Sequence, residues 1–477
     1  MPSLSLLIKP ASGGCNMRCR YCFYADEQSC RTTYSYGFMA EDTLELLTQK
    51  ALSYATRNCS FGFQGGEPTL RGLDFFRKAV QYQEKYNIHG AQVANAIQTN
   101  GLLINEEWAR FFHDNHFLVG LSLDGTKDIH DGNRLDLEGR GTYSRALRAA
   151  QVLAAHKVDF NILTVVTGGA ARSISKIYNF FRRSGLLYQQ YIPCLDALEG
   201  PRGASPYSLT PQQYAKFLKT LFDLWYRDVA AGNFIYIRYF ENLVGMLLGQ
   251  PPETCGLSGQ CTVQHVVEAD GSVYPCDFYC LDPWKLGTVQ EDGFPALAQK
   301  DRALAFIRSS SQVPEGCGAC PYYFICRGAA AGIGSPYRGR GPSGIIFARH
   351  TRNFLPMRCR ACGKLPARWC WPRGEGARCD CGYNVCRLLA GFLRGGCGRV
   401  WGWGHHQAGA GRTAHPAGVH SQLFIWVHGA VHVHSFFAAQ PWQWGDPAFA
   451  YHHALSSRLS AGGAAGEVAF RAGKGKL

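Results

Sequence analysis

The 477-residue sequence lacks the features that direct a chain to a membrane or to export. No apolar run approaches the ~20 residues of a membrane span. The N-terminus has no basic segment followed by a long apolar stretch, so we expect no signal peptide and a cytoplasmic location. In that compartment the 20 cysteines are more readily explained as metal ligands and reduced thiols than as disulfides.

Acidic side chains are scarce in one part of the chain. Residues 329–477 hold 18 Lys and Arg but only four Asp and Glu, whereas residues 1–328 hold 31 of each sign. The net charge of +14 therefore belongs to the tail, and we expect no nucleic-acid partner for the rest of the protein. The length suffices for two or three domains, and two compositions are joined in one chain.

A fourth metal ligand is also missing from the first cysteine motif, Cys15-x3-Cys19-x2-Cys22, which follows a short apolar stretch and a Gly-Gly turn. A zinc site would need another Cys or His at suitable spacing. Three thiolates on one short loop instead suit a 4Fe–4S cube with one open iron. This spacing, with Tyr21 before the last cysteine, resembles the signature of radical S-adenosylmethionine (SAM) enzymes, in which the open iron binds the cofactor.

Strand-like and helical patterns alternate up to about residue 200, which predicts an α/β fold with a partial (β/α)6 barrel over residues 1–235. The expected strands are Leu4–Ile8, Cys59–Gln64, Gln92–Gln98, Phe117–Leu123, Asp159–Val166 and Gln189–Pro193. The expected helices are Glu41–Ala55, Asp74–Tyr86, Glu106–Asn115, Tyr143–His156 and Ser173–Ser184.

Polar motifs follow the ends of these strands, where parallel barrels carry their chemistry. Gln64-Gly-Gly-Glu67-Pro follows the second strand, Gln98-Thr-Asn-Gly the third, and Ser122-Leu-Asp-Gly ends the fourth. Gly65 and Gly66 would let backbone approach a ligand, and Glu67 would offer a carboxylate to an ammonium group. A plain tight turn is the alternative. In the radical SAM barrel that these motifs resemble, the Gly-Gly-Glu segment holds the methionine amino group.

A second cysteine-rich region is expected at residues 236–328. A zinc ribbon needs about four ligands, and six cysteines at these spacings are too many for one zinc. The pattern resembles the SPASM extension, which carries two auxiliary 4Fe–4S clusters. Its cysteines are Cys255, Cys261, Cys276, Cys317, Cys320 and Cys326.

Within this class, residues 1–328 resemble the anaerobic sulfatase-maturating enzymes, through segments such as Leu6–Pro10, Ser60–Thr69 and Ser272–Phe278. The resemblance implies a cytosolic, monomeric enzyme that oxidises a Cys or Ser of an unfolded sulfatase peptide, within a Cys/Ser-x-Pro-x-Arg motif, to Cα-formylglycine. It implies an electron donor such as flavodoxin or ferredoxin. It also implies cofactor contacts from Tyr21, Gly66, Ser122, Arg134 and Leu195, and a catalytic base at Asp277.

The implied chemistry gives Asp277 a physical role. A 5′-deoxyadenosyl radical would remove hydrogen from Cβ of the target residue, and a nearby carboxylate would take the proton of its thiol or hydroxyl. The auxiliary clusters would accept the remaining electron. Asp277 directly follows the proposed ligand Cys276, which would bring it close to a cluster. A turn or helix-cap aspartate is the structural alternative.

Two cysteines that the family pattern expects are absent, because Ala330 and Ala348 occupy their positions. An Ala codon, GCN, preceded by T spells the cysteine codon TGC, so both positions can encode cysteine in the neighbouring frame. We hypothesise that one base is missing near codon 328 and that residues 329–477 are an out-of-frame, irregular tail. An intact frame in the resequenced gene would refute this.

Other functions remain open. Another SPASM-type peptide modifier, such as one forming thioether crosslinks, is the alternative enzyme. A basic zinc or nucleic-acid module in the tail, with Cys359-x2-Cys362 and Val431-His-Val-His434, is the alternative from another class. About twelve irons per chain would indicate three 4Fe–4S clusters, whereas zinc alone would defeat the enzyme interpretation. Four further cysteines match no motif and are expected to be ordinary thiols: Cys30, Cys59, Cys194 and Cys280. For Cys280, its closeness to Cys276 leaves a metal-ligand role as the alternative.

Overall fold

The computed structural model of the protein describes residues 2–198, 201, 203–311, 313, 317–320 and 322–327. The expected out-of-frame tail, with Ala330, Ala348 and its cysteine and histidine motifs, lies outside the described residues. So do Gly328 and the segment 314–316 before Cys317.

Six parallel strands form the centre of the fold, each within one residue of its predicted ends. The hydrogen-bonded order follows the chain, so every connection returns to the next position in the sheet through a helix. The mixed α/β class and the parallel sheet predicted from the sequence are confirmed. The strands are β1 (Leu4–Ile8), β2 (Asn58–Phe63), β3 (Gln92–Thr99), β4 (Leu118–Ser122), β5 (Phe160–Val166) and β6 (Tyr188–Pro193).

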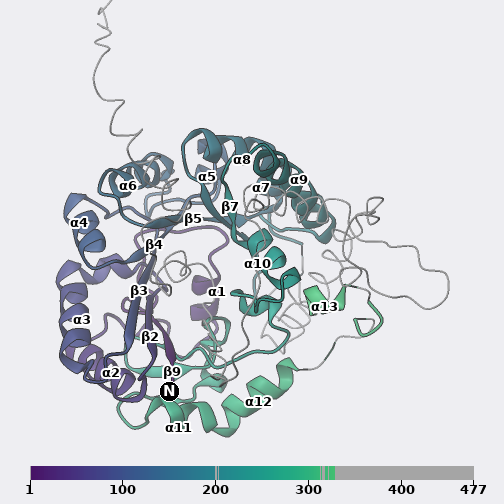
Figure 1. The fold of residues 1–477 in the computed structure, drawn as a ribbon. Helices are drawn as coiled ribbons and strands as arrows, with labels where there is room; N and C mark the ends of the chain where they lie inside the picture. Colours follow the sequence, from purple (N-terminus) through teal and green to yellow (C-terminus); the bar gives the residue numbers. More distant parts are fainter. Residues whose placement is uncertain are drawn as a thin grey trace, which may run out of the picture. The chain divides into compact units, whose positions relative to one another are not determined.

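Amphipathic helices cover the outer side of the strands, as Figure 1 shows for α2, α3, α4 and α6. Each buries its apolar stripe, such as Leu44 and Leu47 on α2, against the sheet. The short α1 (Phe23–Ser29) lies on the inner side instead, and its fully buried residues are polar, Glu27 and Gln28. The outer helices include α2 (Glu41–Tyr54), α3 (Leu73–Tyr86), α4 (Glu106–Asp114), α6 (Tyr143–Ala155), α8 (Ile174–Arg183) and α9 (Pro211–Ala230).

The second region extends the same sheet, which the sequence did not predict. The two-residue strand β8 (Val266–Val267) pairs in parallel with β1, with Leu7 opposite Val266. Strands β9 (Ser272–Tyr274) and β10 (Gly287–Thr288) continue antiparallel beyond it. At the opposite edge, β7 (Tyr236–Ile237) pairs with β6. The sheet of the described residues thus has ten strands, in the order β10-β9-β8-β1 to β7.

One hydrophobic core joins the two regions. Phe63, Phe76 and Phe117 pack edge-to-face or stacked between the sheet and helices α3 and α4. The same buried cluster includes Val267 and Leu297 of the second region. Helices α10 (Arg238–Leu247), α11 (Phe294–Gln299), α12 (Asp301–Ser310) and α13 (Tyr323–Cys326) complete the described elements discussed below, along with short α5 (Lys127–Asp131) and α7 (Gly168–Arg172). None of the described helices is long and apolar enough to cross a membrane.

Candidate functional site

Three thiols lie together on the loop that follows β1. Cys15 and Cys19 are within the loop, and Cys22 occupies the N-cap of α1. Burial raises the pKa of Cys19 to about 12, although the nearby Arg134 guanidinium acts in the opposite direction. Burial also raises the pKa of Cys15, and repulsion from Cys19 and Cys22 adds to that rise. The three thiols are therefore near enough to influence one another, and all three are partly buried.

Two other segments hold this loop in place. Backbone N–H groups of Arg18 and Arg20 donate to the carbonyls of Leu135 and Asn133, at 2.8 and 3.0 Å. From the turn after β3, Asn100 Nδ2 donates to Asn16 Oδ1 at 2.8 Å and lies 3.9 Å from the Cys15 sulfur. The loop conformation is thus fixed by the protein itself.

The two glycines after β2 serve close contacts within the chain. Both have positive φ, +101° at Gly65 and +57° at Gly66. A Cβ on Gly65 would lie 2.7 Å from the Lys9 side chain, and a Cβ on Gly66 would lie 2.3 Å from the carbonyl oxygen of Gly14. The glycines therefore let β1 and the cysteine loop pack against this turn, in addition to any ligand they approach.

Glu67 is buried beneath the turn, and its carboxylate already accepts hydrogen bonds from the protein. Oε1 accepts from Thr69 N and Oγ1 and from Thr99 Oγ1, and Oε2 accepts from Asn100 N at 2.8 Å. Burial raises its pKa, while these donors oppose that rise. The side chain links the ends of β2 and β3, and its contact with a cofactor ammonium group stays a prediction.

Two predicted cofactor residues meet at Asp124, just after β4. Arg134 Nε lies 3.0 Å from Asp124 Oδ2, and the Tyr21 hydroxyl donates to the same oxygen. Ser122 accepts a hydrogen bond from Gln98 at 3.2 Å. Tyr21, Ser122, Arg134 and Asp124 are therefore brought together beside the cysteine loop.

Leu195, the last predicted cofactor residue, lies after β6 and is half-buried. Its carbonyl oxygen accepts a 3.5 Å contact from the Cys194 thiol. Its role stays a prediction.

In the second region, Cys255, Cys261 and Cys276 form another group of neighbouring thiols. Burial raises the pKa of Cys261 to about 12, and Cys255 adds to the rise. Both influence Cys276, which is fully buried at the start of a 3₁₀ turn, η3 (Asp277–Tyr279). The Cys261 backbone N–H donates to Ser310 Oγ at 2.8 Å, which ties this loop to α12.

The remaining predicted ligands occupy one short segment. Cys320 N donates to the Cys317 carbonyl at 3.0 Å, and Tyr323 N donates to the Cys320 carbonyl at 3.0 Å. Cys326 ends α13 and is buried. Two successive turns therefore connect Cys317 and Cys320 to α13, at whose end Cys326 lies.

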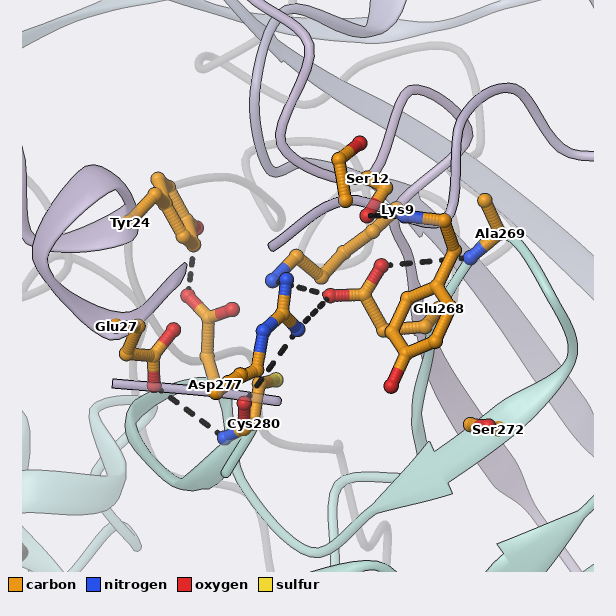
Figure 2. A network of polar contacts seen from close by, with 12 residues as sticks. Lys9, Ser12, Tyr24, Glu27, Glu268, Ala269, Ser272, Asp277 and Cys280 are labelled. Atoms are coloured by element: carbon orange, nitrogen blue, oxygen red, sulfur yellow. Dashed lines mark hydrogen bonds and ion pairs between the residues drawn. The ribbon is translucent and has the colours of Figure 1, made fainter. Parts of the chain in front are cut away.

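Asp277 lies fully buried where the second region meets the barrel (Figure 2). Its Oδ2 accepts a 2.6 Å hydrogen bond from the Tyr24 hydroxyl of α1 and a 3.2 Å hydrogen bond from Gln64 at the end of β2. Gln64 also donates to the Tyr24 oxygen at 2.6 Å. Burial raises the pKa of Asp277 to about 6, while the Lys9 ammonium opposes the rise. The carboxylate is oriented by two barrel side chains.

The donor sets fit iron–sulfur clusters. In the part of the chain that the structure describes, no three His, Cys, Asp or Glu side chains are arranged to hold a single metal ion. A cube does not require that arrangement, because each thiolate binds a different iron. Two groups of mutually repelling thiols, partly or fully buried, are costly to ionise by themselves, and cluster iron would stabilise the thiolates.

The sequence interpretation assigned no role to Tyr24, Gln64 or Asp124. Gln64 and Asp124 each had a local signal, since both stand at the C-terminal end of a barrel strand. Tyr24 had only its place near the third cysteine, because its partner Asp277 is 253 positions away.

Comparisons with known proteins agree with the arrangement described above. Residues 10–181 match the Radical SAM superfamily, and residues 258–321 match SPASM, an iron–sulfur cluster-binding domain.

Several curated relatives share most of the chain. A cysteine-type anaerobic sulfatase-maturating enzyme of Clostridium novyi is 46% identical over 355 residues, which is 74% of this chain and 95% of the relative. The cysteine-type enzyme of Clostridium perfringens is 49% identical over 328 residues, 69% of this chain and 89% of the relative. A serine-type enzyme of Bacteroides thetaiotaomicron is 30% identical over 341 residues, 68% and 82% of the two chains.

A solved structure, native anSMEcpe with bound AdoMet and the Cp18Cys peptide, is also similar. It is 45% identical with a TM-score of 0.70, and the match covers 74% of this chain and 96% of that one.

Proposed function

The chain belongs to the anaerobic sulfatase-maturating enzymes, radical SAM oxidoreductases with a SPASM domain, and from this premise we propose that it oxidises one cysteine of an unfolded sulfatase peptide to Cα-formylglycine. The relatives at 46% and 49% identity are cysteine-type, whereas the serine-type relative is 30% identical, which favours cysteine as the target.

Cys15, Cys19 and Cys22 would hold the first 4Fe–4S cluster, and the bound cluster and SAM supply the one-electron chemistry that removes hydrogen from the target β-carbon. Arg134, Tyr21 and Ser122, arranged around Asp124, would contact SAM, together with the Gly65–Glu67 turn and Leu195. Rigid hydrogen bonds of this kind orient a cofactor before the reaction begins.

Asp277 would take the proton of the target thiol. The observation that carries this assignment is its buried carboxylate, held at Oδ2 by Tyr24 and Gln64, while Oδ1 has no hydrogen-bond partner among the residues that the structure describes. The free oxygen is therefore available to a substrate thiol. Loss of a hydrogen atom, a proton and one electron leaves a C=S group, and water then replaces the sulfur to give the aldehyde and hydrogen sulfide.

The second-region cysteines would hold the auxiliary clusters that accept this last electron. Cys255, Cys261 and Cys276 form one set, and Cys317, Cys320 and Cys326 the other. Cys276 precedes Asp277 directly, so electron acceptor and base would lie on the same turn. We place the boundary between barrel and SPASM region at residues 235/236.

The same assignment implies a peptide motif, an electron donor, an oligomeric state and a location in the cell. The peptide would carry Cys-x-Pro-x-Arg, flavodoxin or ferredoxin would supply electrons, and the enzyme would act as a monomer in the cytoplasm, where sulfatases are still unfolded. It needs neither a membrane nor nucleic acid.

Mass spectrometry tests this function. The anaerobically reconstituted chain and its Ala330→Cys/Ala348→Cys variant are each incubated with SAM, a reductant and a Cys-x-Pro-x-Arg peptide, with the Ser and Ala peptides as controls. Conversion of the cysteine CH2SH group to an aldehyde supports the proposal. An unchanged cysteine peptide with both proteins, while 5′-deoxyadenosine accumulates, would contradict it.

A further inference from the structure

A buried ion cluster lies next to the turn that carries Asp277 (Figure 2). It consists of Lys9 at the end of β1, Arg31 after α1 and Glu268 after β8. Glu268 Oε1 is 2.9 Å from Lys9 Nζ and 2.6 Å from Arg31 Nη1. All three side chains are at most 1% exposed, so the barrel and the second region meet through charges removed from water.

Such a cluster is poorly explained by stability alone. Removing charges from water costs several kcal/mol per ion, and a packed apolar cluster is often as stable or more so. Burial would raise the pKa of Glu268, but Lys9 and Arg31 hold it at about 2, so the carboxylate stays ionised. What ion pairs add over apolar packing is direction, because they fix particular atoms relative to one another.

The cluster is connected to the backbone of the Asp277 turn. Arg31 Nη1 lies 3.4 Å from the carbonyl oxygen of Cys280, the residue that follows η3. The N–H of the same residue donates to Glu27 Oε1 at 3.3 Å. Both anchors come from α1 and the residues after it, which also supply Tyr24. The turn is therefore held at Cys280 through its backbone groups and at Asp277 through its side chain.

The path of Lys9 adds a second, independent observation. Its stem crosses Gly65, where any Cβ would lie 2.7 Å from two of its carbons. A residue in the turn beside the cysteine loop thus leaves room for a lysine that points to the second region. The ion cluster and the cofactor turn are consequently fitted to each other.

We propose that Lys9, Arg31 and Glu268 are positioning residues for peptide oxidation. They set where the Asp277 carboxylate lies relative to the target thiol, and they leave cofactor cleavage at the cysteine loop unaffected. This inference rests on the proposed function of Asp277. A displacement of about 1 Å in a reacting group can lower a rate by ~10²-fold, so a loosened turn would be visible in the product.

Arg31→Met is the main test, because it leaves Lys9 and Glu268 as a balanced pair. Hydrogen–deuterium exchange of the segment 277–284 should rise. The amount of formylglycine formed per 5′-deoxyadenosine should fall by roughly 10–100-fold. Arg31→Lys should recover part of both, since it restores charge without the guanidinium reach. Arg77→Met removes a 2.7 Å pair with Glu107 on the exposed surface and serves as the matched control.

A second variant guards against an effect of the methionine itself. Arg31→Gln also leaves Lys9 and Glu268 as a balanced pair, and it should give the same exchange and product changes while SAM cleavage without peptide stays within about twofold of wild type.

Unchanged exchange and product ratio in both variants would overturn the inference. So would an equal loss of SAM cleavage and peptide oxidation, because that pattern indicates general damage. Absence of formylglycine from wild type and from its Ala330→Cys/Ala348→Cys form would instead count against the proposed function, and the exchange data would still decide the positioning role.

Discussion

The barrel and the second region build their thiol sets in different ways. In the barrel, the three predicted ligands Cys15, Cys19 and Cys22 lie on one loop, which the turns after β3 and α5 hold in place. In the second region, the predicted ligands spread from Cys255 to Cys326 and lie on separate short turns. A set made by one loop is independent of distant sequence. A set gathered from several segments fails when any of them changes, so the two should respond differently to the same damage.

The largest difference should come from the first set. Cys19→Ser removes a proposed cluster ligand, and we expect SAM cleavage to fall by more than the about 10–100-fold typical of outer-shell changes at metal sites. Iron analysis and 5′-deoxyadenosine formation measure this. The exposed Cys30→Ser variant is the matched control and should behave as wild type. Full SAM cleavage by Cys19→Ser would show that the barrel thiols do not hold the cluster that cleaves SAM.

Asp277→Asn should affect the second region alone, with peptide oxidation lowered and SAM cleavage retained. The amide keeps the shape and can keep the contacts with Tyr24 and Gln64, but it cannot accept a proton. Peptide oxidation should fall about 10²–10⁴-fold, the usual contribution of a general base, while 5′-deoxyadenosine still forms. Asp301→Asn, an exposed carboxylate of the same region, is the control. Normal formylglycine yield from Asp277→Asn would exclude it as the base.

Restoring the missing cysteines tests how far the second region is incomplete. If the hypothesis of a lost base near codon 328 is right, this chain gives weak or no turnover and the frame-restored protein is active. Iron should rise toward about twelve per chain, four for each cluster. Equal iron and equal turnover before and after restoration would show that positions 330 and 348 do not matter.

The smallest effect concerns pH and uses one buried histidine from each region. Burial lowers the pKa of both His130 and His265 to about 4, from an ordinary value of 6.5. His130 stays neutral in the fold, since Nδ1 accepts from Asp124 N and Nε2 faces Thr142. Unfolded chains gain a proton below pH 6.5 and folded chains do not, so stability falls between pH 6.5 and 4, by up to roughly 3 kcal/mol per histidine.

Urea unfolding of the iron-free chain across this range measures the slope. His130→Gln and His265→Gln should each flatten it, and because the regions share a sheet they should act on one transition. The exposed His89→Gln variant should leave the slope as it is. Separate transitions for the two variants would indicate that barrel and second region unfold independently.

The features that could be predicted from the sequence are those encoded by a local pattern of residues. Six strands with buried apolar residues, and motifs at their ends, could be placed because each signal lies within a dozen residues. Strand β8 could not, since two valines make no pattern and its partner β1 is more than 250 residues away. The same distance hid the pairing of Lys9 with Glu268. The sequence indicated that Gly65 permits a close approach. It did not indicate that the side chain of Lys9 is one of the approaching groups.

The pairing of β1 with β8 also has a consequence for synthesis of the protein. Strand β1 leaves the ribosome long before β8 and keeps one edge open until residues 266 and 267 appear, and open edges are where chains associate wrongly. The open edge of β1 therefore has to be kept from wrong association until more than half of the chain has been synthesised. Every described strand precedes codon 328. A ribosome that lost the reading frame there would already have made the segments that close this sheet.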